Sequence, residues 1–212
     1  MSTRAGVDPA SQPAQTAHVV NVANGLTLLR LLLVPVFVVV LSAHGGHESG
    51  WRVWAFAVFA AATITDYVDG DLARSRGLVT DVGKVADPIA DKALTGAALI
   101  GLSALGDLPW WVTVVILVRE VGVTGLRFFV IRHGVIPASR GGKAKTLLQN
   151  VAIGLYLLPL SGWAASLRFW LLAAAVVVTV ATGIDYVARA LRLRQTSARA
   201  QMKRARRAAS RS

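Results

Sequence analysis

The chain of 212 residues is too apolar for an ordinary soluble domain, with 54% hydrophobic and only 16% charged residues and a mean hydropathy of +0.55. It contains no cysteine, which excludes disulfides, thiolate metal sites and thiol nucleophiles. A formal net charge of +12 would suit a nucleic-acid-binding protein if the chain were soluble, but in membrane proteins basic residues mark cytoplasmic loops and contacts with anionic lipid. We therefore expect an integral membrane protein with anionic lipid, and no nucleic acid, among its partners.

Six apolar segments follow a polar N-terminal stretch, residues 1–21, which predicts a flexible tail. Each has about the length that spans a bilayer as a helix, roughly 20 residues. The segments cover residues 25–43, 51–69, 85–105, 110–132, 146–161 and 167–191. The sequence thus predicts an all-α integral membrane protein with six transmembrane helices within residues 22–192. The basic C-terminal tail, residues 193–212, is expected to form either an amphipathic helix on anionic lipid or an unstructured tail.

The distribution of lysine and arginine predicts the orientation in the membrane. Basic residues gather in the second loop, residues 70–84, in the fourth loop and in the C-terminal tail, whereas the other three loops carry almost none. The positive-inside rule then places both termini and the second loop on the cytoplasmic side of the cell membrane. The six tryptophans lie near the opposite ends of the segments, as in an interfacial aromatic belt.

Four aspartates interrupt the apolar pattern around the second loop. Asp66 and Asp69 are spaced i and i+3, and Asp87 and Asp91 are spaced i and i+4, so each pair shares one face if its segment is helical. Carboxylates are costly near hydrocarbon unless they have a partner or a function. Converging carboxylates repel one another unless cations neutralise them, and hard divalent cations such as Mg²⁺ or Mn²⁺ prefer oxygen ligands.

The segment that contains these aspartates has a recognisable pattern. Residues 66–91 read DYVDGDLARSRGLVTDVGKVADPIAD, which is DxxDGxxAR, eight further residues and then GxxxDxxxD. This pattern resembles the signature of the CDP-alcohol phosphatidyltransferases, a family of small six-span membrane enzymes. The small residues Gly70 and Ala73 let a nucleotide approach the helix backbone, and Arg74 can pair with a phosphate.

The resemblance implies a role for each position of the motif. Asp66, Asp69 and Asp87 would be ligands of two divalent metal ions, and Asp91 would both contact metal and act as the general base. The donor implied by the family is CDP-diacylglycerol, bound in a polar cavity that opens to the cytoplasm. Its binding residues would be Gly70, Ala73, Arg74, Gly83 and, from its place in the loop, Thr80.

The flanking residues resemble the branch of the family that uses sn-glycerol 3-phosphate as acceptor and releases CMP. The resemblance lies in residues 21–37, 87–92, 119–127 and 142–146. A dianionic acceptor phosphate needs fixed cations, and the candidates are Arg119, Arg127, Lys143 and Lys145. The alternative interpretation is that Arg119 or Arg127 only pairs with Glu120 and that the lysines only orient the loop.

Other interpretations remain open for the sequence as a whole. Branches of the same family use phosphatidylglycerol or an inositol phosphate as acceptor, and a small divalent-cation transporter would also carry intramembrane aspartates. A transporter does not require Gly70, Ala73 and Arg74 at fixed spacing, which favours the enzyme. Members of the family are often homodimers, so a homodimer is possible. Of the other carboxylates, Asp71, Asp81 and Asp107 are interpreted as helix caps or ion-pair members, and Asp185 as an i, i+4 partner of Arg189.

Overall fold

The structure of the protein is a computed structural model. It describes the backbone of residues 22–76, 81–131 and 140–209, and the side chains of residues 25–65, 89–90, 92–126 and 144–192. All regular structure in these residues is helical, which confirms the predicted all-α class. The elements are α1 (Val22–Ser42), the short 3-10 helix η1 (Ala43–Gly46), α2 (Ser49–Arg76), α3 (Asp81–Ala104), α4 (Trp110–Ile131), α5 (Arg140–Leu157) and α6 (Gly162–Ala209).

Each predicted apolar segment coincides with one of the six α-helices, but the predicted second loop is wrong in its extent. Helix α2 continues through Gly70 to Arg76, and α3 begins at Asp81 rather than at residue 85. Leucine, alanine and arginine after Gly70 are strong helix formers, and a single interior glycine costs only about 1 kcal/mol relative to alanine. The DG dipeptide therefore does not end the helix, and the first aspartate pair lies well inside α2.

The last two helices also differ from the predicted segments. Helix α5 begins at Arg140, six residues before the predicted start, and ends at Leu157. It ends there because Pro159 disfavours helical geometry at the residue before it. Helix α6 continues through 48 residues to Ala209, so the C-terminal tail is helical over residues 193–209. At 1.5 Å per residue this helix is roughly 70 Å long, more than twice the hydrocarbon thickness of a bilayer.

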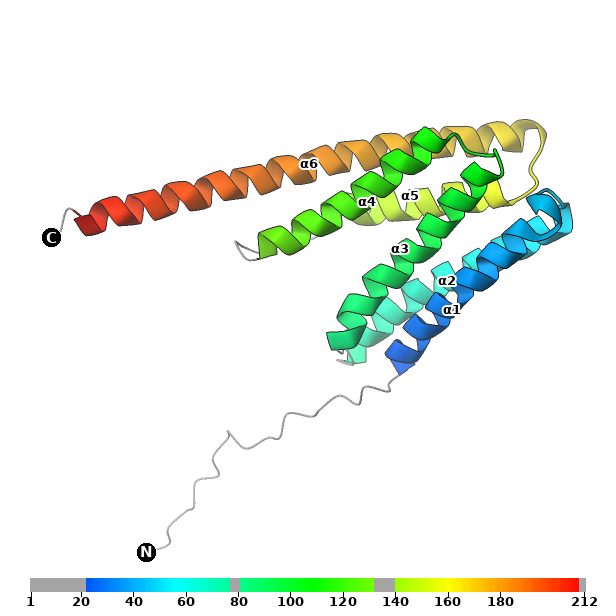
Figure 1. Ribbon diagram of the computed structural model, residues 1–212, viewed down its shortest axis with the longest axis horizontal. Coiled ribbons are helices and arrows are strands. Elements are labelled where there is room, and N and C mark those ends of the chain that lie inside the picture. Colours follow the sequence, from blue (N-terminus) through cyan, green and yellow to red (C-terminus); the bar gives the residue numbers. More distant parts are fainter. Residues whose placement is uncertain (1–21, 77–80, 132–139, 210–212) are drawn as a thin grey trace, which may run out of the picture.

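The helices pack as two halves of three (Figure 1). In the first half α1 packs against both α2 and α3, and in the second half α6 packs against both α4 and α5. Contacts of α2 with α5 and of α3 with α4 and α5 join the halves. The connections at residues 43–48, 105–109 and 158–161 lie together at one end of the molecule, called here the loop end. Toward the other end, where α2 ends and α3 begins, the two halves diverge in Figure 1.

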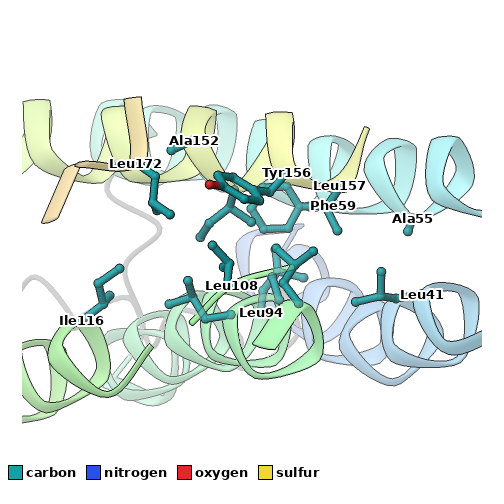
Figure 2. Close-up of a cluster of buried hydrophobic side chains, with 14 of the residues drawn as sticks. Leu41, Ala55, Phe59, Leu94, Leu108, Ile116, Ala152, Tyr156, Leu157 and Leu172 are labelled. Atoms are coloured by element: carbon teal, nitrogen blue, oxygen red, sulfur yellow. The ribbon is translucent and has the colours of Figure 1, made fainter. Parts of the chain in front are cut away.

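A continuous apolar core holds the two halves together near the loop end (Figure 2). All six helices contribute buried side chains, for example Leu41, Phe59, Ile116, Tyr156 and Leu172. The core is built from side chains at helical spacing, because residues three and four apart share one face of a helix. The packing fixes the relative height of the helices and so decides which residues can meet at the other end.

A buried arginine, Arg52, ties the connections of the loop end to one another. Its Nε donates a hydrogen bond of 2.6 Å to the carbonyl oxygen of Gly46, and its Nη1 donates one of 3.1 Å to the carbonyl oxygen of Tyr156. Its Nη2 forms an ion pair with Asp107, which confirms that Asp107 belongs to an ion pair. The single guanidinium therefore links the start of α2 to η1, to the α3–α4 connection and to the end of α5.

The surface of the helices is strongly apolar. Within the described residues, the segments Gly25–Gly46 and Gly162–Arg192 are each long and apolar enough to cross a membrane. Large apolar side chains are also exposed on other helices, including Val118 of α4 at 67%. Contiguous apolar surface of this kind is unfavourable in water and is typical of lipid or protein contact. The chain thus has the surface of a membrane-associated protein, while the crossing of all six helices stays a prediction.

Candidate active site

The first aspartate pair lies on the continuation of a buried stripe of α2. Ala55, Phe59 and Ala62 of this helix are each at most 2% exposed and are spaced by four and three residues. The next two positions in the same 4, 3 rhythm are Asp66 and Asp69. Helix geometry therefore places this carboxylate pair in register with the side of α2 that faces the core.

The second pair has the same relation to α3. Leu94, Ala98 and Leu102 form the buried stripe of this helix, each at most 3% exposed. Steps of three and four residues back from Leu94 reach Asp91 and Asp87. Both carboxylate pairs thus occupy positions at which a continuous core helix would carry apolar residues.

Two contacts of α1 show that the pairs lie at the same height in the bundle. The rings of Phe37 and Phe59 lie with their centroids 6.0 Å apart, which sets the register of α1 against the antiparallel α2. A Cβ atom added to Gly101 would lie 2.7 Å from Cδ2 of Leu41, which sets the register of α1 against the parallel α3. Residue 30 of α1 lies seven residues before Phe37 and eleven before Leu41. The same steps along the neighbouring helices reach residue 66 of α2 and residue 90 of α3, which precedes Asp91.

The remaining motif residues lie close to the pairs along the chain. The last turns of α2 contain Gly70, Ala73 and Arg74, and the first turn of α3 contains Gly83. Thr80 lies outside the described residues. The small residues at 70, 73 and 83 lie in the last turns of α2 and the first turn of α3, where a ligand that approaches these turns would contact the backbone.

Two of the four predicted acceptor-binding cations meet on one carboxylate. Arg119 Nη1 lies 3.0 Å from Oε1 of Glu120, and Nζ of Lys145 forms an ion pair with the same oxygen. Arg119 Nη2 also donates a hydrogen bond of 3.0 Å to Oγ1 of Thr182. The predicted alternative, pairing of Arg119 with Glu120, is therefore present. Two cations thus share one anion in a cluster that joins α4, α5 and α6, with Lys145 buried and Arg119 and Glu120 partly buried.

The other two predicted cations are placed by helix register alone. A Cβ atom on Gly154 of α5 would lie 3.2 Å from the ring of Phe56 of α2, so these two residues lie at the same height. Eleven residues away from this contact, on the side opposite the loop end, Lys143 of α5 is level with residue 67 of α2. A Cβ atom on Gly96 of α3 would lie 3.6 Å from Leu117 of α4, which aligns these two helices in the same way. Ten residues away from this contact, again on the side opposite the loop end, Arg127 of α4 is level with residue 86 of α3. Both cations thus fall at the height of the aspartates.

Buried amide side chains near Lys145 were not anticipated from the sequence. Gln149 is 2% exposed and Asn150 is 9% exposed, and their side-chain oxygens accept no hydrogen bond from the described residues. Gln149 follows Lys145 by one helical turn on the same face of α5. The sequence signal that could have revealed them is the pair of consecutive amide residues within the apolar part of α5, because polar groups buried there need a hydrogen-bond partner.

The donor set of the motif fits divalent metal ions. Positions 66, 69, 87 and 91 supply four carboxylates from core-facing registers of two helices at one height, and carboxylate oxygens are the ligands that Mg²⁺ and Mn²⁺ prefer. Without cations such a set would be strongly self-repelling away from water. Among the side chains that the structure describes, no other group of three or more histidine, aspartate or glutamate residues could hold a metal ion.

Comparison with known proteins identifies the family. Residues 20–181 match the profile of the family described as CDP-alcohol phosphatidyltransferase, which covers most of the chain. The chain belongs to this family. As a CDP-alcohol phosphatidyltransferase it is an enzyme of phospholipid biosynthesis, and the resemblance drawn from residues 66–91 is confirmed.

Several relatives of this phosphatidyltransferase align along most of their length. A Mycobacterium tuberculosis protein named "Probable phosphatidylglycerophosphate synthase" is 58% identical, with 92% of this chain and 98% of the relative covered. The Bacillus subtilis CDP-diacylglycerol–glycerol-3-phosphate 3-phosphatidyltransferase is 38% identical, with 78% and 93% covered. A Streptomyces coelicolor cardiolipin synthase (CMP-forming) is 37% identical, with 72% and 73% covered.

Proposed function

We propose that this CDP-alcohol phosphatidyltransferase is a phosphatidylglycerophosphate synthase, which transfers the phosphatidyl group of CDP-diacylglycerol to sn-glycerol 3-phosphate and releases CMP. The observation that carries the proposal is the complete eight-position motif on α2 and α3, with both aspartate pairs in core-facing register at one height. The 58% identity to a protein named for this activity supports the choice of acceptor.

In the proposed reaction the aspartates have distinct roles. Asp66, Asp69 and Asp87 would hold two Mg²⁺ or Mn²⁺ ions together with Asp91, and the chemistry that these ions supply when bound is stabilisation of negative charge on the diphosphate. Asp91 takes the proton from the acceptor hydroxyl as that oxygen attacks the phosphorus of the phosphatidyl group. The bond between this phosphorus and the oxygen of CMP breaks, and CMP leaves. Gly70, Ala73, Arg74, Thr80 and Gly83 bind and orient the cytidine diphosphate.

The acceptor binds on the side of α4 and α5. Arg119 and Lys145 bring two cations together at Glu120, and cations held in this way suit a dianionic phosphate. Arg127 and Lys143 lie at the height of the aspartates and add positive charge there. The side-chain oxygens of Gln149 and Asn150, which accept no hydrogen bond from the described residues, can accept hydrogen bonds from the hydroxyl groups of a polyol.

The apolar surface of the protein supports a membrane-embedded arrangement. We infer six membrane-spanning helices within residues 22–192, with the loop end outside the cytoplasm and the motif in a cavity open to the cytoplasm. The diacylglycerol chains of the donor then remain in the bilayer, while its cytidine diphosphate enters the polar cavity. The basic C-terminal part of α6 lies on the cytoplasmic side, where it attracts anionic lipid.

The acceptor can be tested directly with the purified protein in detergent or liposomes. CDP-diacylglycerol labelled in the cytidine is supplied with Mg²⁺ and one of three acceptors: sn-glycerol 3-phosphate, phosphatidylglycerol or inositol phosphate. We expect CMP release with glycerol 3-phosphate and its loss when EDTA removes the metal. Turnover only with phosphatidylglycerol would instead assign the activity named for the Streptomyces coelicolor relative, and turnover with none of the three would reject the proposal.

A further inference from the structure

Arg30 is a charged residue buried in the middle of a helix that carries no motif residue. The buried stripe of α1 contains Thr27, Arg30, Phe37 and Leu41, and only 2% of Arg30 is exposed. Withdrawing a guanidinium from water costs several kcal/mol unless carboxylates compensate its charge. The identity of the compensating carboxylates therefore indicates what Arg30 does.

Most acidic residues elsewhere in the protein already have a basic neighbour. The chain contains eleven acidic residues, six of which fall in residues 66–91. The described acidic residues outside that segment pair with bases: Glu48 with His44, Asp107 with Arg52, Glu120 with Arg119 and Lys145, and Asp185 with Arg189. The eleventh, Asp8, lies outside the described residues. Because α1 packs against α2 and α3, the aspartates of these two helices are the candidates to compensate Arg30.

Helix register brings the first aspartate pair to the height of Arg30. Phe37 of α1 faces Phe59 of α2, with 6.0 Å between the ring centroids. Arg30 lies seven residues before Phe37, and Asp66 lies seven residues after Phe59. Seven residues make two turns and return to the same face of a helix, and α1 and α2 run in opposite directions. Arg30 and Asp66 therefore occupy facing register positions of the two helices.

A second, independent contact gives the same height on α3. Leu41 of α1 meets Gly101 of α3, where an added Cβ atom would lie 2.7 Å from the leucine side chain. Eleven residues before these positions, three turns down two parallel helices, lie Arg30 and Ala90. Ala90 is 1% exposed, so this face of α3 is buried. Asp91 is its neighbour in the chain, at the same height.

We propose that Arg30 is a positioning residue of the metal site, which orients Asp66 and balances part of the negative charge of the four aspartates. The inference rests on the proposed function in that it takes these aspartates as metal ligands. Helix α1 is suited to this role because it packs against both helices that carry them (Figure 1). Partners that hydrogen-bond to ligating carboxylates tune metal affinity, and their loss typically costs 10- to 100-fold in affinity or activity.

The test measures metal binding without substrate, as the rise in melting temperature of the detergent-solubilised protein with increasing Mg²⁺ or Mn²⁺. We expect Arg30→Gln to raise the half-saturating metal concentration about 10- to 100-fold, and Arg30→Lys, which keeps the charge, to raise it less. Arg52→Gln is the matched control, because Arg52 is also a buried arginine but lies at the loop end, away from the aspartates. It should lower the melting temperature in the absence of metal and leave the half-saturating concentration unchanged.

The outcomes separate this inference from the proposed function. An unchanged or lower half-saturating concentration in Arg30→Gln overturns the positioning role, and so does the absence of any metal-dependent stabilisation of the unsubstituted protein. If Arg30→Gln does not fold, Arg30→Lys decides, and a half-saturating concentration equal to that of the unsubstituted protein overturns the role. Metal-dependent stabilisation that weakens in the Arg30 variants, together with no CMP release for any acceptor, would reject the proposed transferase and retain the role of Arg30.

Discussion

The two ends of the helical bundle use charged residues in opposite ways. At the loop end the buried guanidinium of Arg52 is satisfied by groups of the protein, through an ion pair with Asp107 and hydrogen bonds to two carbonyl oxygens. At the other end the carboxylates of α2 and α3 continue the core-facing stripes, where apolar residues would give more stability. A closed network of protein groups serves folding, whereas four carboxylates gathered in core-facing register serve a ligand.

The contacts that join the two halves of the bundle are concentrated near the loop end. The apolar core and Arg52 hold all six helices near the loop end (Figure 2). This attachment lets the opposite end remain polar without loss of the fold. We expect substitutions at the two ends to separate into effects on stability and effects on turnover.

The largest effect is expected at the aspartate end, from Asp91→Asn. The amide cannot take a proton from the acceptor hydroxyl, and loss of a general base typically lowers the rate about 10²- to 10⁴-fold. The measurement is the initial rate of CMP release from CDP-diacylglycerol. Asp185→Asn is the matched control, because Asp185 pairs with Arg189 in the C-terminal half of α6, at an Nε to Oδ2 distance of 2.9 Å. It should keep nearly full turnover, and normal turnover in Asp91→Asn would remove Asp91 as the base.

The next effect is expected at the loop end, from Arg52→Gln. Removal of one partner leaves Asp107 without its cation at a partly buried position, and breaking a buried pair costs about 3–5 kcal/mol. Thermal unfolding in detergent should show a lower melting temperature, while kcat of the folded fraction stays unchanged. Asp107→Asn should give a smaller loss, since it leaves the arginine its two carbonyl acceptors. A change in kcat with unchanged stability would contradict the division between the two ends.

The smallest effect is expected between the two ends, from Lys145→Met. Glu120 keeps Arg119 as its partner in this variant, so folding is retained. A lost hydrogen bond to a charged group costs about 1.5–3 kcal/mol, which corresponds to a roughly 10- to 100-fold higher KM for glycerol 3-phosphate. The KM for CDP-diacylglycerol should not change. Leu147→Met on the exposed side of α5 is the control, and an equal rise of both KM values would argue against an acceptor role.

Much of the fold could be predicted from the sequence, because an apolar segment long enough to span a membrane indicates a helix. The predicted second loop failed because glycine and aspartate at 70 and 71 resemble a turn, whereas the residues that follow extend α2 to Arg76. The predicted ion pair of Asp185 with Arg189 is confirmed, since i, i+4 neighbours meet in any helix. Local interactions of this kind need no knowledge of tertiary packing.

The candidate site divides in the same way. Spacing within residues 66–91 was enough to recognise the motif and to identify the family. It could not reveal that Lys145 shares Glu120 with Arg119, that Gln149 is buried one turn after Lys145, or that Arg30 lies level with Asp66. These relations join residues that are distant along the chain, so they depend on the register of one helix against another.

By itself the sequence determined the helical class, the apolar surface and the motif that defines the enzyme family, because these depend on composition and on spacing within single helices. Only the tertiary structure decided which helices pack together, how Arg52 closes the loop end and which cations lie at the height of the aspartates. The physical reason is that apolar side chains attract one another with little preference for partner, whereas the interlocking of particular pairs, such as Phe37 with Phe59, sets the register that aligns the charges at the other end.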